Sequence, residues 1–386
     1  MSQVKRACIC ILLVLFCLLG LCGCWDRKEI NDVNIITAVG LDLNDQEDIE
    51  LTVQFLVPQS SGRQSMSPSN GPSTSSVTAS GITLADAVSK LQAKVPRLLF
   101  WGQTEILLFS EKFARRGIVE EMDYLLRNPD FRLTTFVYVS KNKPADVLGK
   151  SPRMETSTAD ILQKFASLHL KLSMTIKDLK SALHSKAGAF TLPMVELTGE
   201  QPSARRDTTA IFKSDRMVGQ VGSATSQGIL WMTDKLHEAT INLKIEDYPG
   251  DISLRVFRSH TRLKPRYENG KWSMGIHIDC ENDLIQNSTR LTTSNPQAAP
   301  LIENAAEQML TNRLKETIQY AQQQQADIFG FADAFHRKYP HEFNRVKDEW
   351  ETIFQNLEID IHPKFVMRRI GMMRVPSKLS TEEGGE

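Results

Sequence analysis

The chain has 386 residues, and its 46 Lys and Arg balance 46 Asp and Glu. At about 150 residues per domain this length predicts two or three domains. The balanced charge argues against a nucleic-acid partner, which would require a basic surface. Hydrophobic residues make up 41% and charged residues 24% of the chain, which is typical of a globular protein and excludes a disordered chain or a polytopic membrane protein.

The N-terminus has the layout of a secretory signal peptide. Lys5 and Arg6 precede an unbroken apolar run over 7–21. A membrane-spanning helix needs about 20 apolar residues, so this run is short for a permanent span. A positive segment followed by an apolar one is typical of an export signal. We therefore expect residues 1–23 to be a lipoprotein signal peptide; an uncleaved signal anchor is the alternative.

The apolar run ends in Leu21-Cys22-Gly23-Cys24, which resembles a bacterial lipobox. The chemistry requires a thiol at the fourth position, because Cys24 becomes a diacylglyceryl thioether before the chain is cleaved between Gly23 and Cys24. Cys22 departs from the usual Ala, Ser or Thr, but it is small. Cys24 is thus the predicted lipidation site, S-diacylglycerylated with or without an N-acyl chain. Two acyl chains anchor a protein stably, whereas one does so only marginally.

Five of the six cysteines lie at or before Cys24. After cleavage and acylation only Cys280 keeps a free thiol, so the exported protein has no internal disulfide and no multi-cysteine metal site. Loss of Lys5 and Arg6 brings the mature net charge close to −2. Such a surface is not a polybasic membrane binder, so attachment to the bilayer rests on the lipid.

Two strands, 33–43 and 49–57, are predicted around the polar turn 44–48, because apolar and β-branched residues dominate both runs. The acids of this turn suggest calcium, but the turn lacks the glycine and terminal glutamate of a calcium loop. We interpret it as a solvated hairpin turn. Residues 59–80, with nine serines, are predicted to be a mobile loop whose last residues return as a short strand.

The rest of the N-terminal half alternates helical and extended patterns. His169 lies at the edge of one helical stripe and is interpreted as a packed core residue. Gly, Pro, Ser and charged residues over 199–206 predict a domain boundary. The predicted elements are a helix begun by a capping box of Thr83 and Asp86, strands at 105–109 and 131–140, and helices at 118–127, 161–172 and 176–184.

The C-terminal half opens with a predicted hairpin and ends with helices and one strand. The helical stripes are interpreted as facing the domain's own core, with Phe343 and Trp350 as weak candidates for partner contact. The predicted elements are strands at 208–212, 217–221, 239–245, 253–263, 272–278 and 359–366, a helix at 227–231, and helical stripes over 302–314 and 343–357.

These elements predict an α+β protein with mixed or antiparallel sheets and packed helices. After the signal peptide, the predicted domains are an N-terminal α+β domain over 24–200 and a C-terminal α+β domain over 207–372. A frayed tail over 373–386 follows.

No enzyme, metal or cofactor motif is present: there is no nucleophile elbow, no zinc-binding helix, no phosphate-binding glycine loop and no dinucleotide fingerprint. His336 and His341 are separated by a proline, which is poor geometry for one metal. His277 and Asp279 share one face of a predicted strand while Cys280 points to the other, so these three do not form a nucleophile set. We therefore expect a protein that is not an enzyme and holds no metal or cofactor.

Five segments, in order and with compatible spacing, resemble the Ger(x)C family, the lipoprotein C subunits of spore germinant receptors. The similarity runs from the lipobox to about residue 370, with one departure, since a Gly-His pair is more typical where Gly102-Gln103 stand. The segments are Cys24-Trp25-Asp26-Arg27-Lys28-Glu29-Ile30, Trp101-Gly102-Gln103-Thr104-Glu105-Ile106-Leu107-Leu108, Tyr124-Leu125-Leu126-Arg127-Asn128-Pro129-Asp130-Phe131-Arg132, Ala210-Ile211-Phe212-Lys213 through Val218-Gly219, and Gly228-Ile229-Leu230-Trp231.

The resemblance implies an α+β lipoprotein on the outer face of the bacterial cell membrane, here the inner spore membrane, with the lipid on Cys24. It implies partners too: two polytopic subunits, A and B, in a complex that senses nutrients and triggers germination. The family has no agreed catalytic residues, so none is transferred to this sequence.

Two other functions stay open. A lipid-anchored solute-binding protein of a transporter is the first, and it would need two similar α/β lobes with a ligand cleft between them. An enzyme acting on cell wall or lipid is the second, and it would need paired carboxylates in one cleft.

Overall fold

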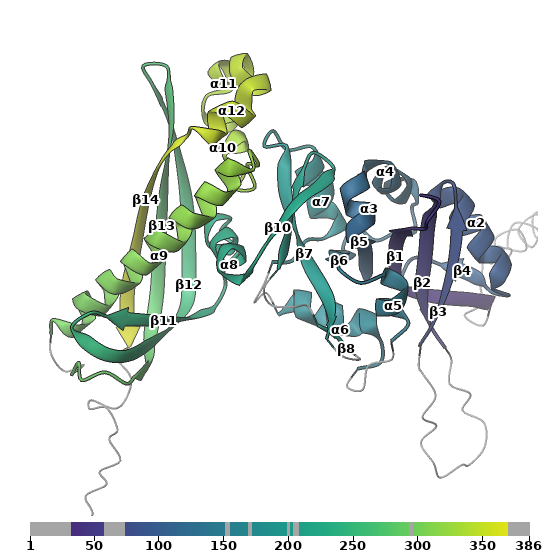
Figure 1. Ribbon diagram of the computed structural model, residues 1–386, viewed down its shortest axis with the longest axis horizontal. Helices are drawn as coiled ribbons and strands as arrows, with labels where there is room; N and C mark the ends of the chain where they lie inside the picture. The colour runs from purple at the N-terminus through teal and green to yellow at the C-terminus, as the bar shows by residue number, and fades with distance from the viewer. Residues whose placement is uncertain are drawn as a thin grey trace, which may run out of the picture.

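The computed structural model describes residues 32–57, 74–150, 155–168, 172–198, 201–203, 208–292 and 296–369. Gly23, Cys24, His169, the predicted tail and most of the serine-rich segment therefore lie outside the described residues. Two sheets stand side by side along the long axis of the molecule (Figure 1). The predicted α+β class, with mixed sheets and packed helices, is confirmed.

The first sheet is mixed and has ten strands. Its order is β10-β9-β7-β6-β5-β1-β2-β3, with β4 beside β1 and β8 beside β7. The strands are β1 (Val33–Leu43), β2 (Ile49–Leu56), β3 (Thr74–Gly81), β4 (Leu98–Phe100), β5 (Ile106–Ser110), β6 (Phe136–Ser140), β7 (Ala189–Thr198), β8 (Gln201–Ser203), β9 (Thr209–Lys213) and β10 (Arg216–Val221). Neighbours from β1 through β5 and β6 to β7 are parallel, and those at both ends of the sheet are antiparallel.

The polar turn between β1 and β2 is a hairpin turn closed by one asparagine. Asn44 Oδ1 accepts hydrogen bonds from the backbone N–H groups of Gln46 and Asp48, both at 2.9 Å. This Asx-type geometry explains the polar residues of the turn without a calcium ion. The end of the serine-rich segment returns as β3, as predicted.

Helices cover both faces of the first sheet. Strand β5 is buried along its whole length because its alternate side chains enter two different cores: Leu107 and Phe109 on one side, Ile106 and Leu108 on the other. The first core is closed by α2 (Leu84–Lys94), α3 (Glu111–Arg116), α4 (Val119–Arg127) and α7 (Ile176–Leu183), and the second by α5 (Pro144–Leu148) and α6 (Thr158–Ser167).

The predicted capping box at the start of α2 is half formed. Thr83 Oγ1 accepts from the backbone N–H of Asp86 at 3.2 Å, as expected. The Asp86 carboxylate instead accepts from the N–H of Ile82 at 3.1 Å. A complete box begins α7, where Thr175 and Asp178 cap each other.

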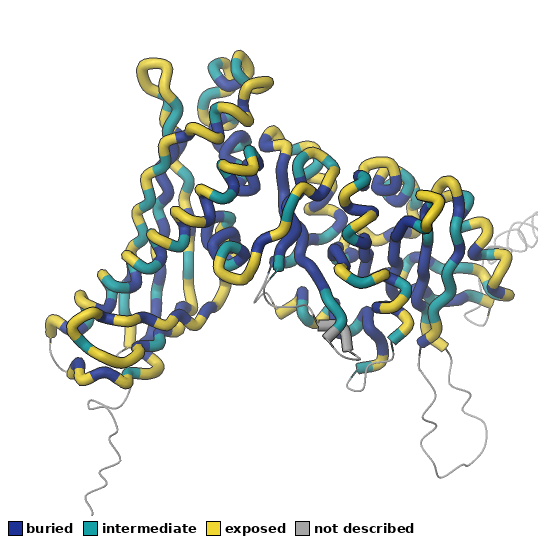
Figure 2. Tube along the Cα trace, in the orientation of Figure 1, coloured by how far each residue is buried: buried dark blue, intermediate teal, exposed yellow. Residues whose placement is uncertain are grey.

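The second sheet has four strands in the order β11-β12-β13-β14. They are β11 (Ala239–Ile245), β12 (Tyr248–Glu268), β13 (Lys271–Asn287) and β14 (Glu358–Arg369). Both β12 and β13 run past the predicted bounds to a two-residue turn, Asn269-Gly270, with φ of 52° and 79°. Positive φ at both positions is typical of the type I′ hairpin turn. Figure 2 shows the hairpin tip exposed in yellow, in contrast to the buried strands of the first sheet.

One face of the second sheet is covered by helices. They are α8 (Ser223–Met232), α9 (Ala298–Gln323), α10 (Phe331–Lys338), α11 (Pro340–Val346), the 3-10 turn η2 (Lys347–Glu349) and α12 (Trp350–Gln355). The stripe predicted over 343–357 is therefore broken into three short pieces, and α10 was not predicted. Phe343 and Trp350 are 1% and 3% exposed, so their interpretation as partner contacts was wrong: they pack in the core.

The two sheets share one hydrophobic cluster. Ile211 of β9 and Val221 of β10 pack with residues of α8, α9 and the second sheet. Lys213 also pairs with Glu351 of α12 at 2.6 Å. The strands β9 and β10, which follow the segment predicted as a domain boundary, thus complete the first sheet and join it to the second.

Candidate functional site

The sequence places its one site at Gly23 and Cys24, both outside the described residues, so the lipidation site stays a prediction. Within the described ranges, no helix is both long and apolar enough to cross a membrane. Nor do three or more His, Cys, Asp or Glu side chains come together as potential metal ligands anywhere in the same ranges. His336 and His341 lie on separate helices, α10 and α11.

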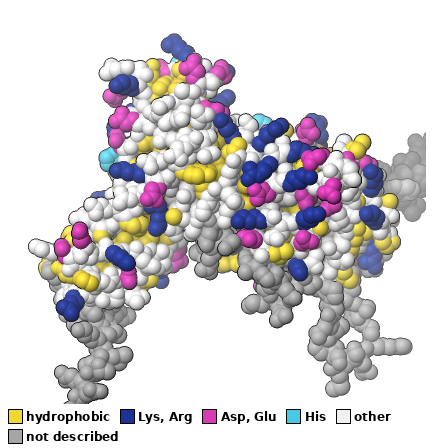
Figure 3. All heavy atoms as spheres, viewed as in Figure 1, with side chains coloured by type: hydrophobic (Ala, Val, Ile, Leu, Met, Phe, Trp, Pro, Cys, Tyr) yellow, Lys and Arg dark blue, Asp and Glu magenta, His cyan; other side chains and the backbone are white. Residues whose placement is uncertain are grey.

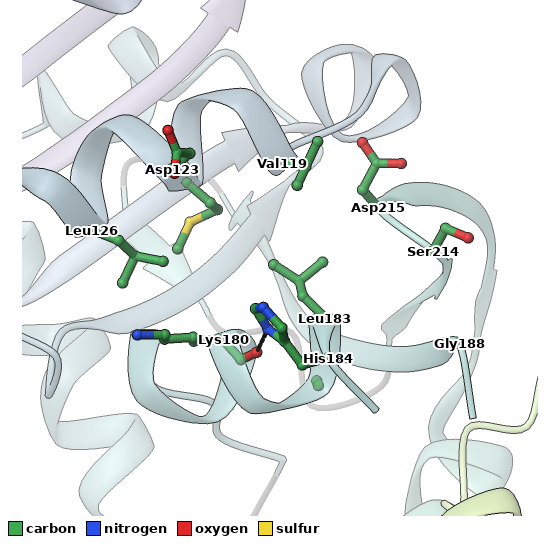
Figure 4. A pocket seen from close by; sticks show the side chains of 11 residues that line it. Val119, Asp123, Leu126, Lys180, Leu183, His184, Gly188, Ser214 and Asp215 are labelled. Carbon is green, nitrogen blue, oxygen red and sulfur yellow. Dashed lines mark hydrogen bonds between the residues drawn. The ribbon is translucent and has the colours of Figure 1, made fainter. Parts of the chain in front are cut away.

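A pocket of about 440 Å³ lies between α4, α7 and the β9–β10 turn, within the size range of small-ligand sites. Figure 4 shows α4 above and α7 below, with the turn closing one end. The lining residues are Val119, Met122, Asp123, Leu126, Lys180, Ala182, Leu183, His184, Gly188, Ser214 and Asp215.

The pocket has an apolar floor and a charged rim. Asp123 pairs with Arg127 at 2.7 Å, and this hydrogen bond lowers the pKa of Asp123. On the other wall, the backbone oxygen of Lys180 lies 2.8 Å from Nδ1 of His184. Carboxylates on α4 and on the β9–β10 turn, with a lysine on α7 and an apolar floor, are suited to a small amphiphilic molecule or to a side chain of a partner protein.

The pocket borders the contact between the two sheets. The backbone N–H of Ser214 donates to the Gly188 oxygen at 2.6 Å. Three residues before Gly188, Ser185 donates to the Asp333 carboxylate of α10, which also accepts from the backbone N–H of Lys186 at 3.1 Å. A molecule bound in the pocket would therefore touch the loop that holds the C-terminal helices.

Sequence reasoning missed this pocket because its walls come from three separate segments. Both helices were predicted, over 118–127 and 176–184, but nothing in either pattern shows that they are neighbours. The signal that brings them together is the parallel pairing of β5, β6 and β7, which is a property of the whole sheet.

The outer face of the second sheet carries a line of paired charges. Arg262 donates to Asp279, and Glu281 accepts from Arg258 at 3.2 Å and from Arg368 at 3.2 Å. Each of these pairs links neighbouring strands, so the face is held by cross-strand ion pairs.

Two histidines stack at the centre of this face. The rings of His277 and His362, partners on the parallel strands β13 and β14, lie 4.9 Å apart between centroids. Burial lowers the pKa of His277, and the nearby Lys264, His362, Arg262 and Arg266 lower it further, which favours a neutral His277 ring at neutral pH.

The predicted placement of His277, Asp279 and Cys280 is confirmed. The first two lie on the outer face, where Asp279 meets Arg262, whereas Cys280 is 1% exposed inside the core. These residues cannot act together on one substrate.

Burial raises the pKa of Cys280 to about 12, so the thiolate is scarce at ordinary pH. We expect the native protein to show no reaction of Cys280 with a thiol reagent at pH 8, because the thiolate is the reactive form. Mass spectrometry after exposure to a maleimide checks this. The same protein in denaturant should take up one label at this position, and fast labelling of the native protein would contradict the placement.

Within the described residues, the segments that carry the family resemblance have structural roles. Trp101 packs on Phe131 with ring centroids 6.3 Å apart. A Cβ atom on Gly228 would lie 2.1 Å from Oγ1 of Thr317, so this glycine lets α8 approach α9. Trp231 is fully buried in the shared cluster. These residues hold the fold together.

Comparison with known proteins covers both halves of the chain. Residues 26–197 match the family model "Spore germination protein N-terminal domain", and residues 207–371 match "Spore germination B3/ GerAC like, C-terminal". The crystal structure titled "GerBC protein" shares the fold, with a TM-score of 0.56, 19% identity, and coverage of 86% of this chain and 96% of that one.

Full-length relatives agree. Spore germination protein KC of Bacillus subtilis (strain 168) is 26% identical over 97% of this chain and 98% of its own length. Spore germination protein B3 of the same organism is 24% identical over 92% of this chain and 96% of its own length. The chain therefore belongs to the Ger(x)C family of spore germination proteins.

Proposed function

We propose that this protein is the lipid-anchored, non-enzymatic C subunit of a nutrient germinant receptor. It docks on the polytopic A and B subunits at the outer face of the inner spore membrane and is required for the germination response. The observation that carries this proposal is the match to both family models, in order, over 26–197 and 207–371.

The lipid on Cys24 gives this role a physical basis. A diacyl anchor confines the folded body to a thin layer beside the bilayer and so raises its effective concentration next to membrane partners. Weak docking contacts then suffice to keep the complex assembled.

The shared cluster of the two sheets supports a coupling role. Because Ile211 and Val221 of the first sheet pack into the core of the second, the domains proposed over 24–200 and 207–372 behave as one body. A partner bound at one end of the body would thus share a continuous network of packed side chains with the other end, which is the physical connection that a coupling role requires.

Co-purification from spores tests the proposal. The full-length protein, tagged at its C-terminus and extracted in mild detergent, should retain one A and one B subunit, identified by mass spectrometry. A tagged lipoprotein of unrelated fold is the control for unspecific membrane capture. Recovery with transporter components in place of A and B would overturn the receptor assignment.

The pocket between α4 and α7 favours one second candidate, a lipid-anchored solute-binding protein. Its position weakens that candidate, however, because it lies within the first body and the two sheets differ in size and order. Calorimetry with amino acids and sugars should therefore show no saturable binding.

A pair of variants makes this test specific to the pocket. Val119 is 50% exposed at the pocket and Leu301 is 36% exposed on α9, so both positions accept tryptophan without disturbing a core. Tight binding that is lost in Val119→Trp and kept in Leu301→Trp would establish the solute-binding function instead.

A further inference from the structure

The start of β1 identifies the end of the molecule nearest the proposed anchor. Strand β1 begins at Val33, nine positions after Cys24. Nine residues span at most about 30 Å when fully extended. The part of the fold around Val33 must therefore stay within this distance of the acylated cysteine.

The short strand β4 lies at that end. Leu98 pairs with Val33 in parallel register, and Phe100 pairs with Ile35. Gln92 of α2 ties the helix to β4, since its side chain donates to the Arg97 oxygen at 2.9 Å and accepts from the Leu99 N–H at 3.0 Å. The last turns of α2 and the strand β4 are thus one unit beside the first residues of β1.

This unit carries positive charge. The chain has no Asp or Glu from position 87 to position 104, whereas Lys90, Lys94 and Arg97 all lie in that stretch. Lys90 pairs with Asp86 at 2.8 Å, and Lys94 donates to the Thr78 oxygen at 2.7 Å. Figure 3 shows Lys and Arg side chains at the right-hand end, where Figure 1 places α2.

An exposed apolar side chain begins β4, directly after Arg97. Leu98 is 53% exposed, next to Arg97 and opposite Val33. Asp32 directly precedes Val33, the pairing partner of Leu98, and is the one acid at the start of β1. An exposed leucine on a unit that also carries Lys94 and Arg97 is suited to the headgroup region of a bilayer, where the cations meet anionic phosphates and the leucine reaches the apolar boundary.

We propose that the end formed by α2 and β4 lies against the anionic phospholipid headgroups of the bilayer that holds the anchor. This inference rests on the proposed lipid anchor and adds an orientation to it. The second sheet, at the opposite end of the long axis (Figure 1), then points away from the membrane. The contact restricts rotation about the tether and so presents a defined side of the body to membrane partners.

A fluorescent label near the surface tests the orientation. Ala93 is exposed on α2 beside Lys94, and Asn269 is exposed at the β12–β13 hairpin tip. Each is replaced by cysteine in the full-length acylated protein and labelled with an environment-sensitive dye, while the buried Cys280 stays unreactive. In vesicles of phosphatidylglycerol and phosphatidylcholine, spin-labelled lipid should quench the dye at Ala93→Cys and leave the dye at Asn269→Cys unquenched.

Charge reversal tests the chemistry of the contact. Lys94→Glu with Arg97→Glu should lower the population in headgroup contact by about ten-fold, since each cation near an anionic surface contributes to binding. Reversal of the exposed Lys244 and Lys271 on the second sheet is the matched control and should change nothing.

The outcomes separate the orientation from the anchor. Equal quenching at both labels, or no effect of reversing Lys94 and Arg97, in a protein that still floats with the vesicles would overturn the orientation and leave the anchor standing. A protein that does not float with the vesicles at all would overturn both.

Discussion

Replacing Cys24 with alanine should release the protein from the membrane fraction and impair nutrient-triggered germination. Without the thiol no diacylglyceryl group is attached, and the mature net charge near −2 gives the body little attraction of its own for an anionic bilayer. We expect the membrane-bound fraction to fall by about ten-fold or more. Immunoblots of membrane and soluble fractions, with germination followed by loss of optical density, measure both effects.

Cys22→Ser is the matched control for this experiment. Serine is common at that position of a lipobox, and Cys22 leaves with the signal peptide, so this variant should be acylated, retained and active. Mass spectrometry of the mature N-terminus then shows whether the chain starts at an acylated Cys24. Normal retention and normal germination in Cys24→Ala would remove the anchor from the mechanism.

Most strands of the first sheet could be predicted because buried strands leave a local sequence pattern, but β4, β7 and β8 were not predicted. Residues 33–43 and 49–57 have the pattern of strands, and the structure has β1 and β2 there, since their apolar and β-branched side chains are buried in the cores of the first sheet. Strand order could not be predicted. The pairing of β5 with both β1 and β6 joins segments that sequence patterns treat separately.

The C-terminal helices show the limit of periodicity. Phe343 and Trp350 lie seven residues apart and read as one stripe, but the chain between them turns at η2, and both side chains still reach the same core. Helix α10 was missed because its start depends on Asp327 and on Gly330, whose φ is +75°. Neither feature belongs to an apolar repeat.

The two candidate sites, the lipobox and the pocket, also differ in how far local sequence patterns can predict them. The lipobox is a pattern of four consecutive residues, Leu21-Cys22-Gly23-Cys24, and the acylation of Cys24 stays a prediction. The pocket between α4 and α7 depends on a parallel sheet, and sequence patterns carry no information about it. A pattern of neighbouring residues is therefore enough to predict a modification site, whereas a concave surface built by distant segments could not be predicted.

Asp327 is the buried carboxylate on which the C-terminal helices depend. It is 1% exposed and accepts from the backbone N–H groups of Phe331 at 3.0 Å and Ala332 at 2.7 Å. It also accepts from the indole Nε1 of Trp350 at 3.1 Å. One side chain thus begins α10 and holds the first residue of α12 against it.

Asp327→Ala should lower the free energy of unfolding by about 3 to 5 kcal/mol, because three buried donors lose their acceptor. Urea unfolding followed by tryptophan fluorescence measures the change, and Trp350 reports directly on the site. Asp333→Ala is the control, since Asp333 binds Ser185 and Lys186 nearer the surface. This replacement should lower the free energy of unfolding by less than Asp327→Ala does. Equal stability of Asp327→Ala and the parent would contradict the network.

The pH dependence of the same site gives a second, independent result. Burial raises the pKa of Asp327 to about 6 from 3.8, although the N–H donors oppose the rise. The folded state therefore binds the proton more tightly than the unfolded state does. The contribution of this tighter proton binding to the free energy of unfolding is complete below about pH 4. It is lost as the pH rises to about 6, which lowers the free energy of unfolding by about 3 kcal/mol.

Asp327→Asn isolates this effect because its amide cannot ionise, while every other acid is unchanged. The free energy of unfolding of Asp327→Asn minus that of the parent should rise between pH 4 and pH 7 by about 3 kcal/mol. Parallel urea titrations of the variant and the parent across this range measure the difference. The pH dependence of all other ionisable groups is the same in both proteins and therefore cancels. A flat difference, or one that falls with pH, would mean that the donors of Phe331, Ala332 and Trp350 outweigh burial and keep the carboxylate charged.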